Sequence, residues 1–139
     1  MFRSMEASDI PAIVELGGRV VPNPGDVFLS WDAMPGVLFC MIENPDLFAL
    51  VVDNEGAIEG AVIAGITAYP WDDSVLVCMV ALLWSGVPGH GKMLMGEVSR
   101  RARAMGATLM LAGSRTDRAS HLYSAMGMKP VETNYMGRL

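Results

Sequence analysis

The stretch Val75–Trp84 reads VLVCMVALLW and runs almost directly into Gly86–Gly91, which reads GVPGHG. The apolar run is about half the length of a membrane-spanning helix, so it is better explained as a central strand covered on both faces. The glycine turn leads into a helix predicted over about Gly89–Met105. Such a turn aims free backbone N–H groups and the helix dipole at one spot, the geometry that binds phosphate or pyrophosphate. A plain tight turn is the alternative, because the chain has 15 glycines.

The residues before this strand predict two helices and a hairpin. Phe2–Met5 fits a short strand, and Ser8 or Asp9 caps a helix that Gly17-Gly18 ends. After a loop over Val21–Ser30, a helix is expected over Trp31–Glu43, because apolar residues recur there at helical spacing: Met34, Val37, Leu38 and Met41. Two strands, Leu47–Asp53 and Ile58–Ala68, flank a turn sequence, Asp53–Gly56, that is typical of an antiparallel hairpin.

The residues after the long helix predict a strand over Thr108–Ala112, a helix over Thr116–Met126 capped by Thr116, and a final extended segment over Pro130–Leu139. With Ser74–Trp84 as the third strand of the middle group, the order is β-α-α-β-β-β-α-β-α-β. This order predicts an α/β or α+β domain with helices on one mixed sheet. A length of 139 residues fits one domain over 1–139.

Composition and charge narrow the class of partner. The chain is 52% hydrophobic and 18% charged, with a formal net charge of −5, which is a globular composition. An acidic protein lacks the positive surface that phosphate backbones require, so nucleic acid is not expected as its partner. A cationic partner such as an amine is compatible with this charge, and no membrane segment is expected.

The cysteines and histidines point to no redox or metal chemistry. Cys40 and Cys78 lie in apolar patterns and are interpreted as buried small hydrophobes of a reduced, cytoplasmic protein without a secretory signal. His90 and His121 are the only histidines, and no further ligands cluster with them, so no metal is expected. Trp31, Trp71 and Trp84 are expected to pack in the core or along the rim of a substrate cleft.

A second motif lies in the last predicted helix, where Thr116–Met128 reads TDRASHLYSAMGM. Leucine and tyrosine at helical spacing are by themselves most often core residues. Together with the glycine turn and the element order, however, this segment resembles the GNAT superfamily of N-acetyltransferases. That family has Gln/Arg-x-x-Gly-x-Gly/Ala after its fourth strand, where Gly89 and Gly91 match, and later Asn-x-x-Ala-x-x-Leu-Tyr-x-x-x-Gly-Phe. The resemblance covers nearly the whole chain, and Met5–Ile13 also looks like the family's first strand and helix.

The resemblance implies a GNAT fold, with a mixed, mostly antiparallel sheet splayed after its fourth strand and about four flanking helices. It implies that acetyl-CoA is the co-substrate, that an amine attacks its thioester directly, and that Tyr123 donates a proton to the departing thiolate. The residues it places at the cofactor are the strand edge Met79, Val80 and Ala81, the loop amides of Val87, Gly89, His90, Gly91 and Lys92, and the motif positions Thr116 and Ala119. The acceptor is a small-molecule or protein amine, and a homodimer is compatible with the resemblance.

The departures from the family pattern leave alternatives open. Gly86 stands where the family usually has Gln or Arg, Pro88 has no N–H to donate, and Thr116 and Met128 replace Asn and Phe. The strand Val75–Val80 lacks the glutamate that many members use as a general base, so the base is a water relay, a loop carboxylate such as Asp72 or Asp73, or absent. A domain that binds coenzyme A or a protein without turnover is therefore the second hypothesis.

Overall fold

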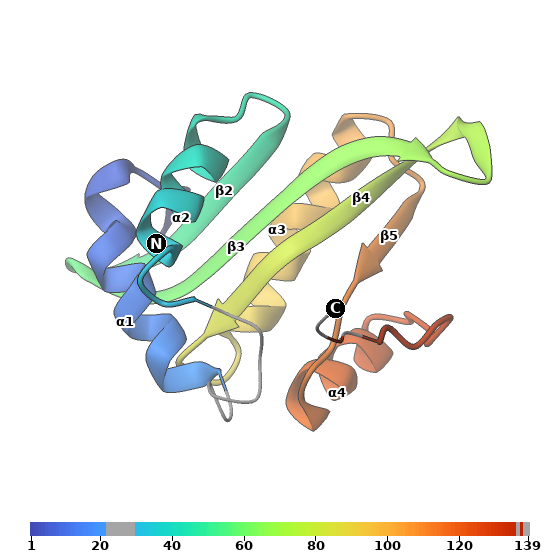
Figure 1. Ribbon diagram of the computed structural model, residues 1–139. Coiled ribbons are helices and arrows are strands. Elements are labelled where there is room, and N and C mark those ends of the chain that lie inside the picture. Colours follow the sequence, from blue (N-terminus) through green and yellow to red (C-terminus); the bar gives the residue numbers. More distant parts are fainter. Residues whose placement is uncertain (22–29, 136, 138–139) are drawn as a thin grey trace.

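The computed structural model describes residues 1–21, 30–135 and 137 (Figure 1). In chain order its elements are β1 (Phe2–Ser4), the short 3-10 helix η1 (Ala7–Asp9), α1 (Ile10–Val20), α2 (Met34–Glu43), β2 (Leu47–Asn54), β3 (Ala57–Tyr69), β4 (Asp72–Ser85), α3 (His90–Ala104), β5 (Leu109–Ala112) and α4 (Asp117–Ala125). The strands form one sheet in the order β1-β2-β3-β4-β5, antiparallel except for the parallel pair β4–β5. The predicted mixed sheet with flanking helices is confirmed.

Helices α1 and α2 cover one face of the sheet, and α3 covers the other (Figure 1). Successive residues of β2 show why both faces are needed, because side chains alternate along a strand. Val51 packs with Ile13 and Leu38 on the α1–α2 side, whereas its neighbour Val52 packs with Leu94 on the α3 side. The middle of β2 and of β3 is thus buried on both faces. Strand β4, which the sequence predicts to be covered on both faces, is buried only at Val77 and Cys78, and Met79 is 47% exposed.

The β2–β3 hairpin forms as its turn sequence predicts. Glu55 and Gly56 have φ angles of 53° and 93°, the pair of positive values that a two-residue hairpin turn requires. Directly after this turn the register shifts, so that Val52 pairs with Gly60 and Asp53 with Ile58. Glu59 therefore has no partner on β2 and forms a bulge.

Strands β4 and β5 separate before β4 ends. They pair only from Val77↔Leu109 to Val80↔Ala112, while β4 continues to Ser85. A shift in the β3–β4 register leaves Ala81 without a partner on β3, at the point where β5 departs. Because a bulge bends its strand, this irregularity accompanies the splay between β4 and β5 that Figure 1 shows. Helices α3 and α4 both begin at this end of the molecule.

The end of α1 differs from expectation. The helix does not stop at Gly17-Gly18 but runs to Val20. A Cβ at Gly17 would lie only 2.5 Å from Cζ3 of Trp84, so this glycine lets the helix pack closely against β4. Gly17 therefore reflects a packing requirement and not a helix end, whereas a Cβ at Gly18 would meet nothing within 4 Å.

Some expected core residues are exposed. On α2, which buries Met34 and Leu38, Val37 is 48% exposed and Cys40 is also exposed, because both lie off the stripe that faces the sheet. Cys78 is buried as predicted. Met105, the predicted last residue of the long helix, lies one residue beyond its observed end at Ala104 and is 54% exposed.

The final predicted strand is not formed in the part of the chain that the structure describes. Residues 130–135 and 137 contain no strand, and Val131 and Tyr135 are 76% and 93% exposed. An apolar alternation stabilises a strand only if a neighbouring edge pairs with it and one face is covered, and here neither occurs. The rest of that segment (136, 138 and 139), and most of the loop predicted over Val21–Ser30 (22–29), lie outside the described residues. Throughout the described ranges, every helix is too short or too polar to cross a membrane.

Candidate functional site

The glycine loop between β4 and α3 presents backbone donors to one point. Gly89 caps α3 with a φ angle of 89°, a conformation that side-chain-bearing residues rarely adopt. The N–H groups of Gly89, Gly91 and Lys92 have no hydrogen-bond acceptor within residues 1–21 and 30–135. His90 differs, because its N–H donates to the carbonyl of Val87 at 3.2 Å. Free N–H groups at a helix N-terminus form an anion-binding site.

Neighbouring groups hold this loop in place. The hydroxyl of Ser85 donates to the carbonyl of Val87 at 2.9 Å, and the N–H of Gly86 donates to the carbonyl of Glu59 at 2.9 Å. A Cβ at Gly86 would lie 3.0 Å from Cδ1 of Leu16. The backbone thus approaches α1 so closely that the Gln or Arg usual in the family would need Leu16 to shift, which accounts for the glycine.

Of the three β4 residues that the sequence places at the cofactor, only Ala81 lies where the backbone edge of β4 is free. Met79 and Val80 still have register partners on β5, Leu111 and Ala112. Ala81 is the first residue past this pairing, and from there to Ser85 the edge that faces β5 has no partner strand among the described residues. An unpaired strand edge can hydrogen-bond an extended ligand as an added strand.

Tyr123 lies close to this splay. Its ring is buried, and its hydroxyl donates to the carbonyl of Gly113 at 3.3 Å. Gly113 directly follows β5, so the hydroxyl lies where that strand has left β4. Burial raises the pKa of Tyr123 above its ordinary value, because desolvation disfavours the phenolate. The side chain therefore holds its proton at neutral pH.

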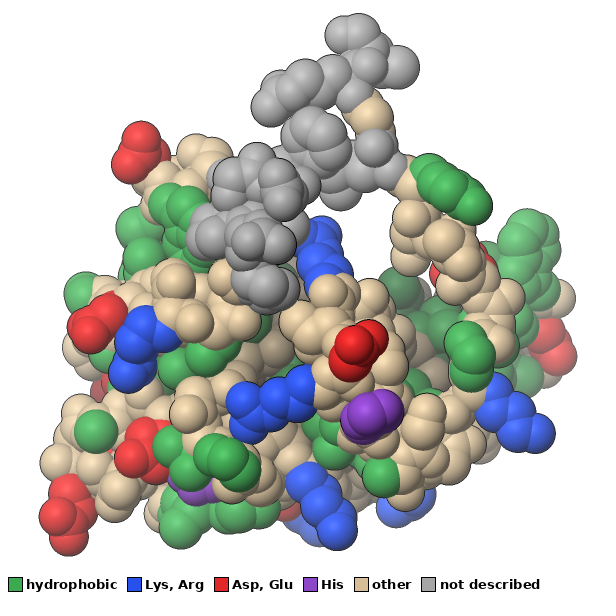
Figure 2. Space-filling model, turned by 90° about the horizontal axis from the view of Figure 1, so that it is seen from below, with side chains coloured by type: hydrophobic (Ala, Val, Ile, Leu, Met, Phe, Trp, Pro, Cys, Tyr) green, Lys and Arg blue, Asp and Glu red, His purple; other side chains and the backbone are tan. Residues whose placement is uncertain are grey.

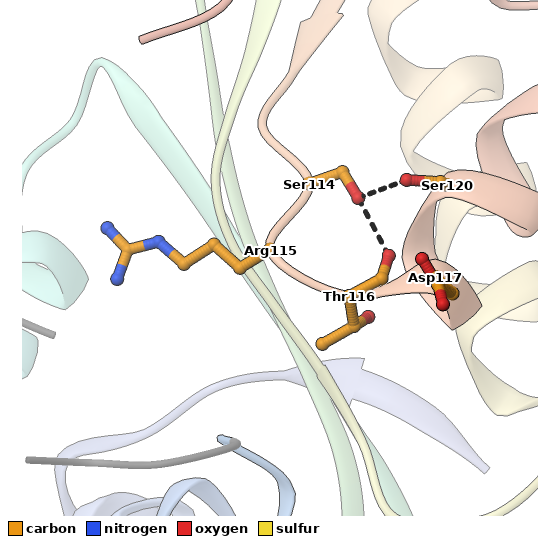
Figure 3. Close-up of a pocket in the computed structure, with 5 residues that line it drawn as sticks. All are labelled: Ser114, Arg115, Thr116, Asp117 and Ser120. Atoms are coloured by element: carbon orange, nitrogen blue, oxygen red, sulfur yellow. Dashed lines mark hydrogen bonds between the residues drawn. The ribbon is translucent and has the colours of Figure 1, made fainter. Parts of the chain in front are cut away.

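Between β5 and α4 there is an open cavity of about 480 Å³, lined by Ser114, Arg115, Thr116, Asp117 and Ser120 (Figure 3). The Ser114 hydroxyl donates to the Thr116 carbonyl at 2.9 Å and lies 2.6 Å from the Ser120 hydroxyl. Arg115 points away from the other four side chains in Figure 3. The cavity contains Thr116 of the predicted cofactor residues, but the Thr116 hydroxyl already accepts the N–H of Ala119 at 3.1 Å.

The end of the molecule at which α3 and α4 begin carries positive charge despite the net charge of −5. Figure 2 views this end and shows several Lys and Arg side chains on it. Lys92 follows the glycine loop, and Arg115 and Arg118 flank the start of α4. None of these three forms an ion pair with another described residue. They are therefore available to attract an anion.

Several residues considered from the sequence lie elsewhere. Asp72 and Asp73 lie at the opposite end of β4 from the glycine loop, and the strand from Asp72 to Ala81 spans about 30 Å at the usual rise per residue. Neither aspartate can serve as a base at the splay. Trp71 lies at the same distant tip and is 84% exposed, whereas Trp31 and Trp84 pack together with ring centroids 6.1 Å apart.

Four other residues of the site were not predicted from the sequence. Glu59 contacts the loop through a bulge on β3, and Gly113 accepts from Tyr123 through its backbone carbonyl, so neither forms part of a motif. Ser114 and Ser120 could have been noticed as small polar residues beside the helix cap. Within the described ranges, no three His, Cys, Asp or Glu side chains are grouped so that they could hold a metal ion.

Comparison with solved structures identifies the fold. An acetyltransferase from Trypanosoma brucei is 19% identical, with a TM-score of 0.75, over 100% of this chain and 99% of that one. A transcriptional regulator from Bacillus halodurans is 15% identical, with a TM-score of 0.84, over 100% and 99%. The aminoglycoside N-acetyltransferase AAC(6')-Iy in complex with CoA is 17% identical, with a TM-score of 0.76, over 100% and 93%. No protein-family model and no curated protein matches the sequence.

The chain therefore has the GNAT fold, as the resemblance of its two motifs predicted. At 15–19% identity these similarities define the fold, while activity has to be argued from the site.

Proposed function

We propose that this protein is an acetyl-CoA-dependent N-acetyltransferase that passes the acetyl group directly to an amine. The observation that carries the proposal is the set of N–H groups on Gly89, Gly91 and Lys92 that have no acceptor in the described part of the chain, beside the free edge of β4. Coenzyme A contains a pyrophosphate and an extended amide-bearing arm, so one molecule suits both features. That a solved structure of the same fold is a complex with CoA supports this assignment.

The pyrophosphate would accept hydrogen bonds from the loop amides, with Lys92 and Arg118 adding attraction. The pantetheine arm would lie along β4 from Ala81 onward and hold the thioester at the splay. A neutral amine would attack the thioester carbonyl, so that the carbon–nitrogen bond forms as the carbon–sulfur bond breaks, and the proton lost from the nitrogen would pass to solvent water. Most of the acceleration would come from holding the thioester in position for attack.

Tyr123 would supply the proton for the departing sulfur. Its hydroxyl lies at the splay, and its raised pKa keeps the proton in place until the thiolate forms. The bond to the Gly113 carbonyl is long at 3.3 Å, so exchanging it for a bond to sulfur costs little. General-acid assistance of this kind is typically worth 10²–10⁴-fold.

A second candidate is a domain that binds coenzyme A without turnover. The observation that favours it is the absence of Asp and Glu from Ser74 to Val87, which covers almost all of β4 and the start of the loop. Without a base, a protonated amine cannot attack, unless water or a residue outside the described ranges removes its proton.

The test is a single-turnover measurement of thioester cleavage with acetyl-CoA and a panel of small-molecule and peptide amines. The proposed function predicts amine-dependent release of free thiol and formation of an N-acetyl product. Coenzyme A binding by calorimetry without transfer to any amine would favour the binding domain. Absence of binding would contradict both.

A further inference from the structure

The imidazole of His90, at the first position of α3, has an unusual environment. Its Nδ1 atom is buried and has no hydrogen-bond partner among the described residues. Oε2 of Glu59 lies 3.5 Å away, just beyond the range of a good hydrogen bond. The two side chains are only 15% and 25% exposed. A buried polar atom this close to an acceptor needs only a small movement to form a bond.

Glu59 contacts both ends of the anion-binding loop. Its backbone carbonyl accepts the N–H of Gly86, at the start of the loop, at 2.9 Å. Its carboxylate faces His90, at the end of the loop, and its Oε1 atom accepts from Nδ2 of Asn54 at 3.2 Å. The β3 bulge leaves Glu59 unpaired on β2, so the side chain is free to turn toward α3.

Of the charged groups around this pair, the Glu59 carboxylate disfavours anion binding and Lys92 favours it. On β3 the carboxylate of Glu59 lies within 4.0 Å of the imidazole, and on α3 the exposed Lys92 follows two residues later. On β2 Asp53 is paired with Arg3, and on α4 the exposed His121 precedes Leu122, whose side chain lies beside Gly91. An unscreened carboxylate beside an anion site repels the ligand.

We propose that His90 and Glu59 form a proton-coupled clamp on the anion-binding loop. When a pyrophosphate-containing ligand binds, His90 takes up a proton from solvent, Nδ1 donates to Oε2 of Glu59, and the imidazolium lies between the carboxylate and the ligand. Histidine is the side chain whose charge changes between pH 5 and 8, and a neighbouring anion favours its charged form. Ligand affinity therefore rises as pH falls through this range. The inference rests on the proposed function only in taking a coenzyme A-type pyrophosphate as the anion.

The experiment measures binding of dephospho-coenzyme A by calorimetry at pH 6 and pH 8. This probe keeps the pyrophosphate but lacks the phosphate monoester, which itself titrates near pH 6. For the unmodified protein we expect binding about tenfold tighter at pH 6 than at pH 8, which is about 1.4 kcal/mol. At pH 7, heats measured in two buffers of different ionisation enthalpy should show proton uptake, up to about one proton per ligand.

Three variants test whether His90 and Glu59 cause the proton uptake and the pH dependence of binding. His90→Gln should remove both the proton uptake and the pH dependence. Glu59→Gln keeps the Gly86 bond and the Asn54 contact but removes the charge, so it should bind more tightly than the unmodified protein at pH 8 and show a smaller change with pH. His121→Asn changes the only other histidine and should behave like the unmodified protein.

Proton uptake that survives in His90→Gln, or pH-independent binding by the unmodified protein, would overturn the clamp. Binding is measured without turnover, so the outcomes separate the two proposals. Acetyl transfer together with pH-independent binding would contradict the clamp and support the proposed function. Binding that depends on pH, without acetyl transfer, would support the clamp and contradict the proposed enzymatic activity. A folded protein that binds at neither pH contradicts both.

Discussion

The N-termini of α3 and α4 lie at the same end of the molecule but are built in opposite ways. The N-cap of helix α3 is Gly89, which has no side chain to cap it, and N–H groups of the first turn have no partner among the residues that the structure describes. Helix α4 begins with Thr116, whose hydroxyl accepts the N–H of Ala119. One helix end is open to an external anion, and the other satisfies its own donors.

A helix can contribute to a site either through the free N–H groups of its first turn or through a side chain, and the two helices differ in this respect. An uncapped helix end leaves N–H groups for which a ligand is the natural partner. A capped end is complete, so α4 would act through a side chain. The buried Tyr123, about two turns beyond the cap, is the side chain that faces the splay. The contrast predicts that α3 determines affinity and α4 determines turnover.

The largest expected effect is on turnover, in Tyr123→Phe. The change removes the proton donor and keeps the ring, so single-turnover thioester cleavage should fall by about 10²–10⁴-fold. Affinity for acetyl-CoA should change little, because the hydroxyl acts mainly in the transition state. Tyr135→Phe, at a tyrosine that is 93% exposed, is the matched control. Normal turnover with early melting would make Tyr123 a packing residue and remove the role assigned to α4.

A loss of affinity is expected for Gly89→Glu. The new carboxylate would lie at the anion site, and the φ angle of 89° at Gly89 disfavours any side chain. Coenzyme A binding should weaken at least about 100-fold, which is about 2.7 kcal/mol, as measured by calorimetry. Gly96→Glu introduces the same charge at an exposed glycine further along α3, where nothing lies within 4 Å. Unchanged affinity in Gly89→Glu would show that the loop is only a turn.

Binding at the open end of α3 should also stabilise the fold. A ligand that binds only the native state at 100 times its dissociation constant adds about 2.7 kcal/mol. A thermal-shift titration with acetyl-CoA should therefore raise the melting temperature of the unmodified protein and of Tyr123→Phe, but not of Gly89→Glu. Equal shifts in all three would mean that the ligand binds elsewhere.

The smallest effect is expected at the closed helix end, in Thr116→Ala. Loss of the cap should lower the free energy of unfolding by about 1 kcal/mol, as measured by denaturant melts, and Thr116→Ser should restore it because the hydroxyl remains. A fall in coenzyme A affinity without a fall in stability would instead show that Thr116 serves the ligand, and the contrast between the two helices would disappear.

The same contrast shows how far sequence reasoning reached. The turn at Glu55-Gly56, the glycine loop and the cap at Thr116 were predicted because each depends on residues adjacent in the chain. The interpretation of Gly17-Gly18 as a helix end was wrong, because the close approach of Trp84 is a contact between distant segments. Exposure of Val37 and Cys40 was missed for a similar reason, since apolar spacing does not tell which side of a short helix meets the sheet.

The order of elements, the mixed sheet and the two motifs were determined by local patterns: apolar runs, glycine turns and helix caps. Only the tertiary structure decided where β5 leaves β4, that the Tyr123 hydroxyl meets the Gly113 carbonyl, and that Glu59 faces His90. The first depends on the register of β4 with β5, the second on how α4 packs beside the end of β5, and the third on the bulge in the β2–β3 register. A shift of one residue in that register turns side chains to the other face of the sheet, and no local pattern specifies it.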